Sequence, residues 1–219
     1  MKVLLSIQAH PDDTDFFAGG TVAKFIENGW TVIYVSVTDG AKGTFDHDIK
    51  PETLAKVRME EQRRAAKVLG VEDTIFLGYE DTTLHPNLEL RGELIKIIRE
   101  VRPSIVMTHD AWKPYEVHPD HRCTGIVATE AATFASLPHV NPEHLEIGLK
   151  PHRVEAIYLF DTVNPNTVID TMDVMEKKIK ALSEHRSQQG EVIGKLAKER
   201  DSLLGKKIGK HYAEPFMKL

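Results

Sequence analysis

The chain has 219 residues, 41% of them hydrophobic and 28% charged, and its formal net charge is −5. This length and composition suit one globular domain with a sizeable core, while the negative charge argues against nucleic-acid and anionic membrane partners, which favour basic patches. The single cysteine, Cys123, excludes an internal disulfide, and no apolar run approaches the roughly 20 residues of a membrane span, so we expect a cytoplasmic protein.

The N-terminal part of the chain alternates between strand and helix. The apolar run over residues 3–8 predicts a buried strand, which ends directly before His10-Pro11-Asp12-Asp13. Two glycines predict a turn over residues 15–20, and an amphipathic helix should follow over residues 21–29. The β-branched run over residues 31–38 predicts a second strand. This order is the repeating unit of a parallel sheet.

The alternation continues to the end of the chain, with one long loop over residues 136–153. Further strands are expected over residues 74–77, 104–108, 154–160 and 167–170. Helices are expected over residues 51–69, 88–101, 122–135, 173–188 and 191–206. We therefore predict an α/β protein with a mostly parallel sheet and helices on both faces, in one domain over residues 1–219 that includes the C-terminal helices from about residue 173.

Two histidine clusters follow predicted strands, where ligands bind in α/β folds. His10 and Asp13 are three residues apart and can form a clip for a metal ion. His118 and His121 have the same spacing, and one of them would supply the remaining ligand. Two imidazoles and a carboxylate suit Zn²⁺, with Fe²⁺, Co²⁺ and Mn²⁺ as alternatives. A bound metal would lower the pKa of its water towards ~7.

Other groups in the two clusters are left free for catalysis. Asp12 would lie beside the metal as a general base, and the spare histidine would stabilise an oxyanion or protonate a leaving amine. Asp120 would orient one of the imidazoles. Alone, His10-Pro11-Asp12-Asp13 could equally be a helix cap or an Asx turn. The second cluster, His118-Pro119-Asp120-His121, favours the metal site.

The sequence resembles the signature of the PIG-L / LmbE-like zinc de-N-acetylases. The resemblance begins with residues 9–13, Asp15 and residues 19–21. It continues through Thr38-Asp39-Gly40, Arg58 with Glu61, residues 118–121, Lys180-Ala181-Leu182, His185, Ser187-Gln188 and residues 212–216. These matches run in order over nearly the whole chain, and the two histidine motifs are the most specific of them.

This resemblance implies a Rossmann-like three-layer fold and hydrolysis of an acetamide, often on an N-acetylglucosamine-type sugar or its conjugate. It implies that zinc binds to His10, Asp13 and His121. Asp12 would be the general base and His118 the acid or electrostatic partner. The resemblance and the amphipathic C-terminal helices also lead us to expect a homo-oligomer, with a hexamer as the state that the family suggests.

The resemblance also assigns residues around the substrate. Arg58 would meet the sugar, although a solvated arginine that pairs with a neighbouring glutamate has the same sequence pattern. Some relatives carry a tyrosine before the second cluster, where this chain has Glu116 with Tyr115 beside it, so both are substrate-binding candidates. Asp15 would orient the His10 ring from behind.

Two other functions use the same residues. One is hydrolysis of an amide in a thiol or other conjugate, with the same metal chemistry on a different acyl group. The other is a non-catalytic module that binds a metal or a sugar. The presence of Asp12 argues against such a module, because a metal can be held without that carboxylate. Cys123 and His109 are expected to have packing and hydrogen-bonding roles.

Overall fold

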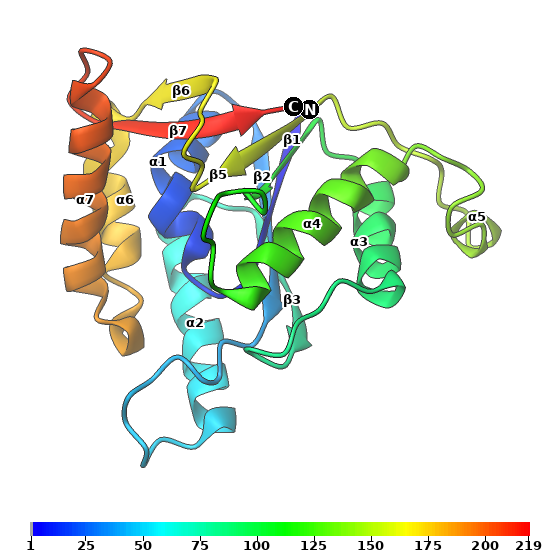
Figure 1. Cartoon of the computed structure of the whole chain (residues 1–219), viewed down its shortest axis with the longest axis horizontal. Helices are drawn as coiled ribbons and strands as arrows, with labels where there is room; N and C mark the ends of the chain where they lie inside the picture. The colour runs from blue at the N-terminus through cyan, green and yellow to red at the C-terminus, as the bar shows by residue number, and fades with distance from the viewer. Residues whose placement is uncertain (1) are drawn as a thin grey trace.

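The structure, a computed structural model, describes residues 2–219 and is built on a seven-stranded sheet (Figure 1). The strand order is β3-β2-β1-β4-β5-β7-β6. The strands are β1 (Val3–Gln8), β2 (Thr31–Thr38), β3 (Asp73–Tyr79), β4 (Ile105–His109), β5 (Ala156–Phe160), β6 (Thr167–Asp170) and β7 (Ala213–Lys218). The first five strands are parallel, and β7 runs antiparallel to β5 and β6. The predicted α/β class with a mostly parallel sheet is confirmed.

Helices cover both faces of the sheet (Figure 1). They are α1 (Asp13–Glu27), α2 (Pro51–Leu69), α3 (Leu88–Val101), α4 (Pro119–Phe134), α5 (Glu143–Glu146), α6 (Met175–Leu182) and α7 (Gly190–Lys206), with 3₁₀ turns η1 (Met172–Val174) and η2 (Arg186–Gln188). α3 and α4 pack on one face, α1 and α2 pack on the other, and α6 and α7 lie outside them. Over the described part of the chain, no helix is both long and apolar enough to cross a bilayer.

The alternation of side chains along each strand divides the core into two layers. Leu5 and Ile7 of β1 are buried in the layer beneath α3 and α4. Leu4 of the same strand is buried in the layer beneath α1 and α2. A strand with apolar side chains on both faces is what a doubly covered parallel sheet requires. The apolar run of β1 is therefore explained by its central position in the sheet, between β2 and β4.

The predicted turn before the first helix is wrong, because α1 begins at Asp13 and continues through Gly19 and Gly20. These glycines allow close packing instead of a turn. A Cβ atom at Gly20 would lie 2.7 Å from Cγ2 of Thr171, and one at Gly19 would lie 3.2 Å from Cγ of Lys178. The C-terminal part of the chain thus approaches the α1 backbone at a distance that only glycine permits.

β7 was not predicted as a strand, and the predicted loop over residues 136–153 contains the short helix α5. The β7 sequence includes Pro215 and two charged residues, which is not a strand pattern. Its pairing is long-range: residues 213–216 pair with β6 and residues 217–218 pair with β5. Tertiary contacts, including those of the buried Glu214, select this strand against its local preference.

A buried ion cluster joins β7 to the helices. The Nζ atom of Lys178 is 2.6 Å from Asp201 Oδ2 and 2.7 Å from Glu214 Oε1, and all three side chains are buried. Glu214 also accepts hydrogen bonds from the backbone N–H groups of Gly20 and Thr21. Burial outweighs the attraction to Lys178 and raises the pKa of Asp201 to about 6. This cluster links α1, α6, α7 and β7.

We expect Lys178→Met to lower the free energy of unfolding by about 3–5 kcal/mol, because it leaves the buried Glu214 carboxylate without a cation and leaves Asp201 with Arg200 alone. Chemical unfolding followed by circular dichroism measures this change. The neighbouring Lys177 is a matched control, since it forms only a partly exposed pair with Glu27 at 3.8 Å. Lys177→Met should cost less than about 1 kcal/mol. Equal stability losses in the two variants would contradict the role of the cluster.

Candidate active site

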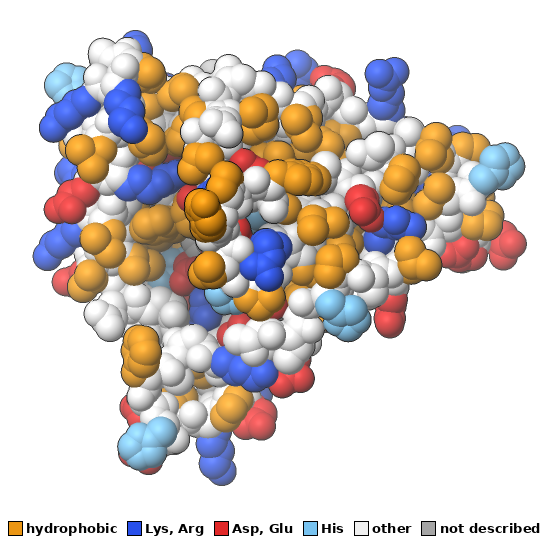
Figure 2. Space-filling view, viewed as in Figure 1, with side chains coloured by type: hydrophobic (Ala, Val, Ile, Leu, Met, Phe, Trp, Pro, Cys, Tyr) orange, Lys and Arg blue, Asp and Glu red, His pale blue; other side chains and the backbone are white. Residues whose placement is uncertain are grey.

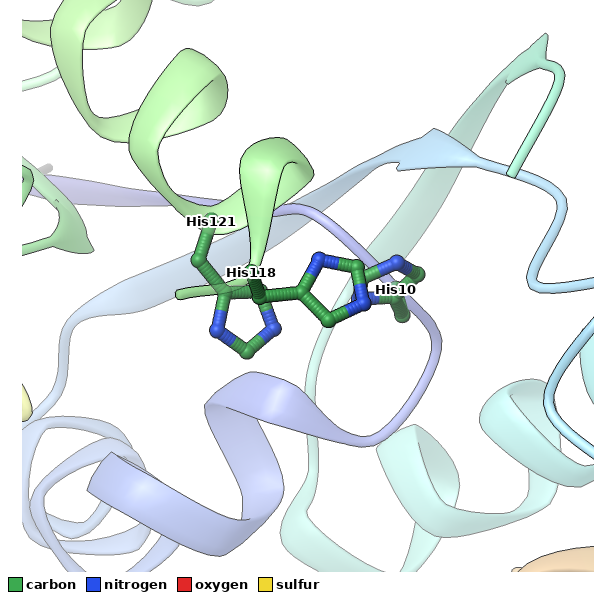
Figure 3. Close-up of side chains that lie close together, drawn as sticks. All are labelled: His10, His118 and His121. Carbon is green, nitrogen blue, oxygen red and sulfur yellow. The ribbon is translucent and has the colours of Figure 1, made fainter. Parts of the chain in front are cut away.

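The two histidine clusters lie side by side at one edge of the sheet. His10 follows β1, whereas His118 and His121 lie at the start of α4, after β4. β1 and β4 are parallel neighbours, so both strands end at the same edge. Figure 3 shows His118 directly before α4, His121 on the first turn of α4 and His10 on the loop after β1. The centroid of the His10 ring is 4.6 Å from that of His118 and 5.2 Å from that of His121.

The carboxylate of Asp13 lies between imidazoles of both clusters. Its Oδ2 atom is 3.4 Å from His10 Nδ1, and its Oδ1 atom is 3.3 Å from His121 Nε2. A third imidazole, that of His109, places Nε2 at 3.3 Å from Oδ2. Burial alone would favour the neutral acid, but His121 and the hydrogen bond with His10 outweigh it and hold the pKa of Asp13 well below its usual value. Asp13 is therefore an anion surrounded by imidazole rings.

The His10 ring is oriented by carboxylates on its other side. Its Nε2 atom is 3.1 Å from Asp81 Oδ1 and 3.1 Å from Asp120 Oδ2. Burial opposes a charge on the ring, but the hydrogen bonds to Asp120, Asp13 and Asp81 outweigh it and raise the pKa of His10 to about 11. With Nε2 engaged in this way, Nδ1 is the His10 nitrogen that faces Asp13.

Side chains of both clusters can hold a divalent metal. Ligand atoms of His10, His118 and His121 lie within 4.8 Å of one another, and so do those of Asp13, His109 and His121. The predicted ligands His10, Asp13 and His121 draw on both groups, and Asp13 contacts both of the other side chains. This N/O donor set fits zinc. The contact between His10 Nε2 and Asp120 is the kind that orients a metal-binding imidazole.

Asp12 lies next to this donor set and is held by Arg58. The Nη2 atom of Arg58 is 3.2 Å from Asp12 Oδ2 and also donates to the Pro11 carbonyl at 2.6 Å. Arg58 is buried, so it is not a solvated helix-face residue. Burial raises the pKa of Asp12, and the charge of Arg58 only partly offsets this. Gly40 gives Arg58 its space, because a Cβ there would lie 2.6 Å from Nη1.

A cavity of about 230 Å³ opens beside these groups. It is smaller than the roughly 300–1,000 Å³ pockets that enclose drug-sized ligands, which suits one end of a substrate. Mostly polar residues line it, namely His10, Asp12, Lys42, Gly43, Arg58, Asp81, Thr82, His118 and Gln188. Larger hollows, such as those of about 420 and 520 Å³ along residues 63–74 and 183–192, are not lined by residues of the two histidine clusters. The smaller cavity is therefore the candidate site, because residues of both histidine clusters line it.

Two predicted substrate contacts do not line this cavity. Tyr115 is 94% exposed and has a positive φ of 64°. Glu116 is drawn back into its own loop, because its carboxylate is 2.7 Å from Lys113 Nζ and accepts the backbone N–H of His118 at 3.0 Å. Lys113 lowers the pKa of Glu116 against the effect of burial. In this structure Glu116 supports the loop that carries His118.

Asp15 contacts a different imidazole from the one predicted. Its Oδ2 atom is 2.8 Å from His185 Nε2 and also accepts from Gln62 Nε2, while its Oδ1 atom accepts from the Tyr34 hydroxyl. The ring of His10 is instead oriented by Asp120. The reason is geometric: α1 begins at Asp13, so Asp15 already lies within the helix and faces α2 and the C-terminal segment.

Several site residues were not predicted from the sequence. Asp81, Lys42 and Gln188 line the cavity but belong to no histidine motif. Asp81 follows β3 at the same edge of the sheet as His10, and that position was the available signal. His109 was expected to form a hydrogen bond at its strand end, and it does accept one from the Ala9 N–H at 3.2 Å. Burial lowers the pKa of His109 to about 4, which keeps this acceptor neutral.

Comparison with known sequences identifies similar proteins over the whole chain. The family model described as "PIG-L: GlcNAc-PI de-N-acetylase" matches residues 5–132. A diacetylchitobiose deacetylase from Thermococcus kodakarensis is 41% identical over 98% of this chain and 82% of its own length. A probable N-acetyl-alpha-D-glucosaminyl L-malate deacetylase 2 from Bacillus anthracis is 28% identical, over 97% of this chain and 93% of its own.

Solved structures show the same similarity. The N,N'-diacetylchitobiose deacetylase from Pyrococcus horikoshii has a TM-score of 0.95 and 40% identity, and the match covers 100% of this chain and 84% of that one. GalB from Pseudomonas putida, a 4-carboxy-2-hydroxymuconate hydratase, has a TM-score of 0.85 with 24% identity, over 100% of this chain and 96% of its own. The second match shows a shared fold only.

We expect Asp13→Asn to weaken zinc binding, because it removes the anionic ligand itself. Loss of a residue that only orients a metal ligand lowers metal affinity roughly 10–100-fold, and the loss in Asp13→Asn should be larger. Competition with a chelating dye measures the affinity. The exposed group Asp46-His47-Asp48 supplies a control, since its ligand atoms also lie within 4.8 Å of one another. Asp46→Asn should leave zinc affinity unchanged. Wild-type affinity in Asp13→Asn would remove Asp13 from the ligand set.

Proposed function

The chain belongs to the PIG-L family of GlcNAc-PI de-N-acetylases, and from that premise we propose that it hydrolyses the acetamide of an N-acetylglucosamine-type sugar. Membership makes it a deacetylase that cleaves an amide C–N bond. The observation that carries the proposal is the arrangement of Asp12 and His118. Both line one small polar cavity beside the candidate metal ligands. Hydrolysis would add water across the amide C–N bond and give acetate and a free amino sugar.

Zinc is the metal that we propose, with His10, Asp13 and His121 as its ligands; Fe²⁺, Co²⁺ or Mn²⁺ could occupy the same donor set. When bound, such an ion polarises a carbonyl group and lowers the pKa of a water molecule towards ~7. Asp120 supports the assignment by fixing the His10 ring through Nε2, so that Nδ1 faces Asp13.

Asp12 is the proposed general base, which takes a proton from the water that attacks the acetamide carbon. Its side chain makes no cap hydrogen bond to α1, although Asp12 is the N-cap residue. The carboxylate instead faces the cavity and Arg58. Burial raises the pKa of Asp12, which makes the carboxylate a stronger base than an exposed aspartate.

His118 is the proposed partner of the carbonyl oxygen and the leaving amine. Its Nδ1 atom accepts the backbone N–H of Asp120 at 3.3 Å. In the neutral ring the proton is therefore on Nε2, where it can be donated. Burial lowers the pKa of His118, which favours this neutral form. Nε2–H would stabilise the developing oxyanion, and the proton that Asp12 took from water would pass to the amine as the C–N bond breaks.

The cavity supports a polar, uncharged substrate end. Arg58, Asp81 and Gln188 all line the cavity and bring it donors and acceptors, as sugar hydroxyls require. The cavity volume of about 230 Å³ suits one sugar ring, with the remainder of a conjugate in solvent. On the face drawn in Figure 2, Lys and Arg side chains are interspersed with Asp and Glu, which agrees with a small-molecule partner.

The test of this function is an acetate-release screen on the zinc-loaded protein. The substrates are N-acetylglucosamine, diacetylchitobiose, longer oligomers and N-acetylglucosamine conjugates. Release of acetate with formation of a primary amine from at least one of these sugars is expected. Amide-linked thiol conjugates belong in the same panel. Cleavage of those conjugates with no release from any sugar would contradict the proposed substrate class.

We expect Asp12→Asn to lower kcat by about 10²–10⁴-fold, because the amide cannot accept a proton from water. Zinc content should remain at the wild-type level, since Asp12 is outside the proposed ligand set. Acetate release and metal analysis on the same preparation measure the two quantities. Wild-type turnover in this variant would remove Asp12 as the base, and loss of zinc would make it a ligand.

We also propose that the protein forms a homo-oligomer. Val192, Leu196 and Leu203 of α7 are exposed and recur at helical spacing, so they form an apolar stripe. Apolar side chains are visible on the surface over α7, at the left of Figure 2. Light scattering at micromolar concentration should give a multiple of the 24.7 kDa chain mass. A monomer mass would refute the proposal.

A further inference from the structure

The backbone of Asp12 adopts a conformation that is unfavourable for this residue type. Its φ and ψ are 104° and −25°, in the region that favours glycine. Such a conformation costs on the order of 1–3 kcal/mol and persists only when surrounding groups impose it. Since Asp12 is the proposed general base, the groups that impose this backbone also set the direction of its carboxylate.

Two side chains of α2 hold the peptide that precedes this backbone. The Pro11–Asp12 peptide has its carbonyl oxygen 2.6 Å from Arg58 Nη2. The N–H group of the same peptide donates to Gln62 Oε1 at 2.7 Å. Arg58 and Gln62 are four residues apart, so they project from the same side of α2. They therefore hold both polar ends of one peptide plane.

The orientation of the Gln62 amide is fixed by its other contacts. Its Oε1 atom also accepts from Gln8 Nε2 at 2.9 Å, and its Nε2 atom donates to Asp15 Oδ2 at 2.9 Å. Asp15 in turn accepts from Tyr34 and lies against His185. A flipped amide would set its NH₂ group against the donors of Asp12 and Gln8. Gln62 is fully buried, so water cannot replace these contacts.

We propose that Gln62 is a positioning residue for catalysis, which holds the Asp12 backbone so that its carboxylate faces the attacking water. The proposal rests on the general-base function of Asp12. Arg58 holds the carboxylate itself as well as the Pro11 carbonyl. Gln62 contacts neither the cavity nor the proposed metal ligands through a hydrogen bond, and it acts only through the peptide. Its role is therefore separable from metal and substrate binding.

The test is Gln62→Met, which keeps the length of the side chain and removes both polar groups. In the zinc-loaded protein, kcat should fall on the order of 10–100-fold, because a small misplacement of a catalytic group has this effect. KM and zinc content should stay within about twofold of wild type, since the substrate and metal contacts are kept. Hydrogen exchange of the Asp12 amide, followed with ¹⁵N-labelled aspartate, should be slow in wild type and at least tenfold faster in the variant.

Ser6→Ala is the matched control. It removes another buried hydrogen bond beneath α1, from Ser6 Oγ to Thr14 Oγ1 at 2.9 Å, without touching the Pro11–Asp12 peptide. This variant should have wild-type kcat and wild-type Asp12 exchange. If it loses as much kcat as Gln62→Met, the effect is general loosening of α1 and the proposal is overturned. Wild-type kcat or unchanged Asp12 exchange in Gln62→Met also overturns it.

A second variant, Gln62→Asn, tests the proposal if Gln62→Met does not fold. Gln62→Asn keeps an amide but is one methylene shorter, so it cannot bridge Asp15 and the Asp12 N–H together. It should show the same loss of kcat and the same faster exchange. Fast exchange of the Asp12 amide in the wild-type protein would overturn the proposal without any variant. An inactive wild-type protein with a protected Asp12 amide would instead contradict the proposed function and leave the Gln62 contact standing.

Discussion

The parallel pairing of β1 with β4 is the constraint on which the whole site depends. Leu4, Leu5 and Ser6 are in register with residues 105–107, so both strands deliver their following loops to one edge. The Ala9 N–H group then bonds to His109, directly beyond the pairing. An antiparallel pair would have sent the two histidine clusters to opposite edges of the sheet. The geometry of the candidate metal site is thus a consequence of sheet topology, and the apolar residues of β1 stabilise both.

The amino-acid sequence predicted the parts of this protein that depend on local pattern. Apolar runs located β1, β2 and α3, and the spacing within each histidine motif indicated the donor set. Apart from the shared site of the two histidine clusters, it did not predict features that depend on contacts between distant segments. The glycines of α1 suggested a turn because their neighbour, Thr171, is distant in the sequence. β7 was missed because its pairing, not its composition, makes it a strand.

The same distinction separates the predicted and unpredicted residues of the site. His10 and His121 are histidines in a recognisable motif, so their ability to bind a metal can be predicted from the sequence. Gln62 has no such signature, since a glutamine on a polar helix is ordinarily a solvated residue. Its importance appears only when α2 is seen to lie across the loop after β1, where the Asp12 N–H needs an acceptor. A buried amide of this kind, which accepts a backbone N–H group of the candidate site, is therefore found from the structure and not from a sequence motif.

The contact between Glu214 and α1 affects how the chain can fold during synthesis. Its carboxylate accepts the N–H groups of Gly20 and Thr21, which lie at the other end of the sequence. On the ribosome this contact cannot form until translation has passed residue 214. Closing so large a loop is also entropically slow. α1 is therefore among the first segments made, but its contact with Glu214 forms only after nearly the whole chain has been synthesised.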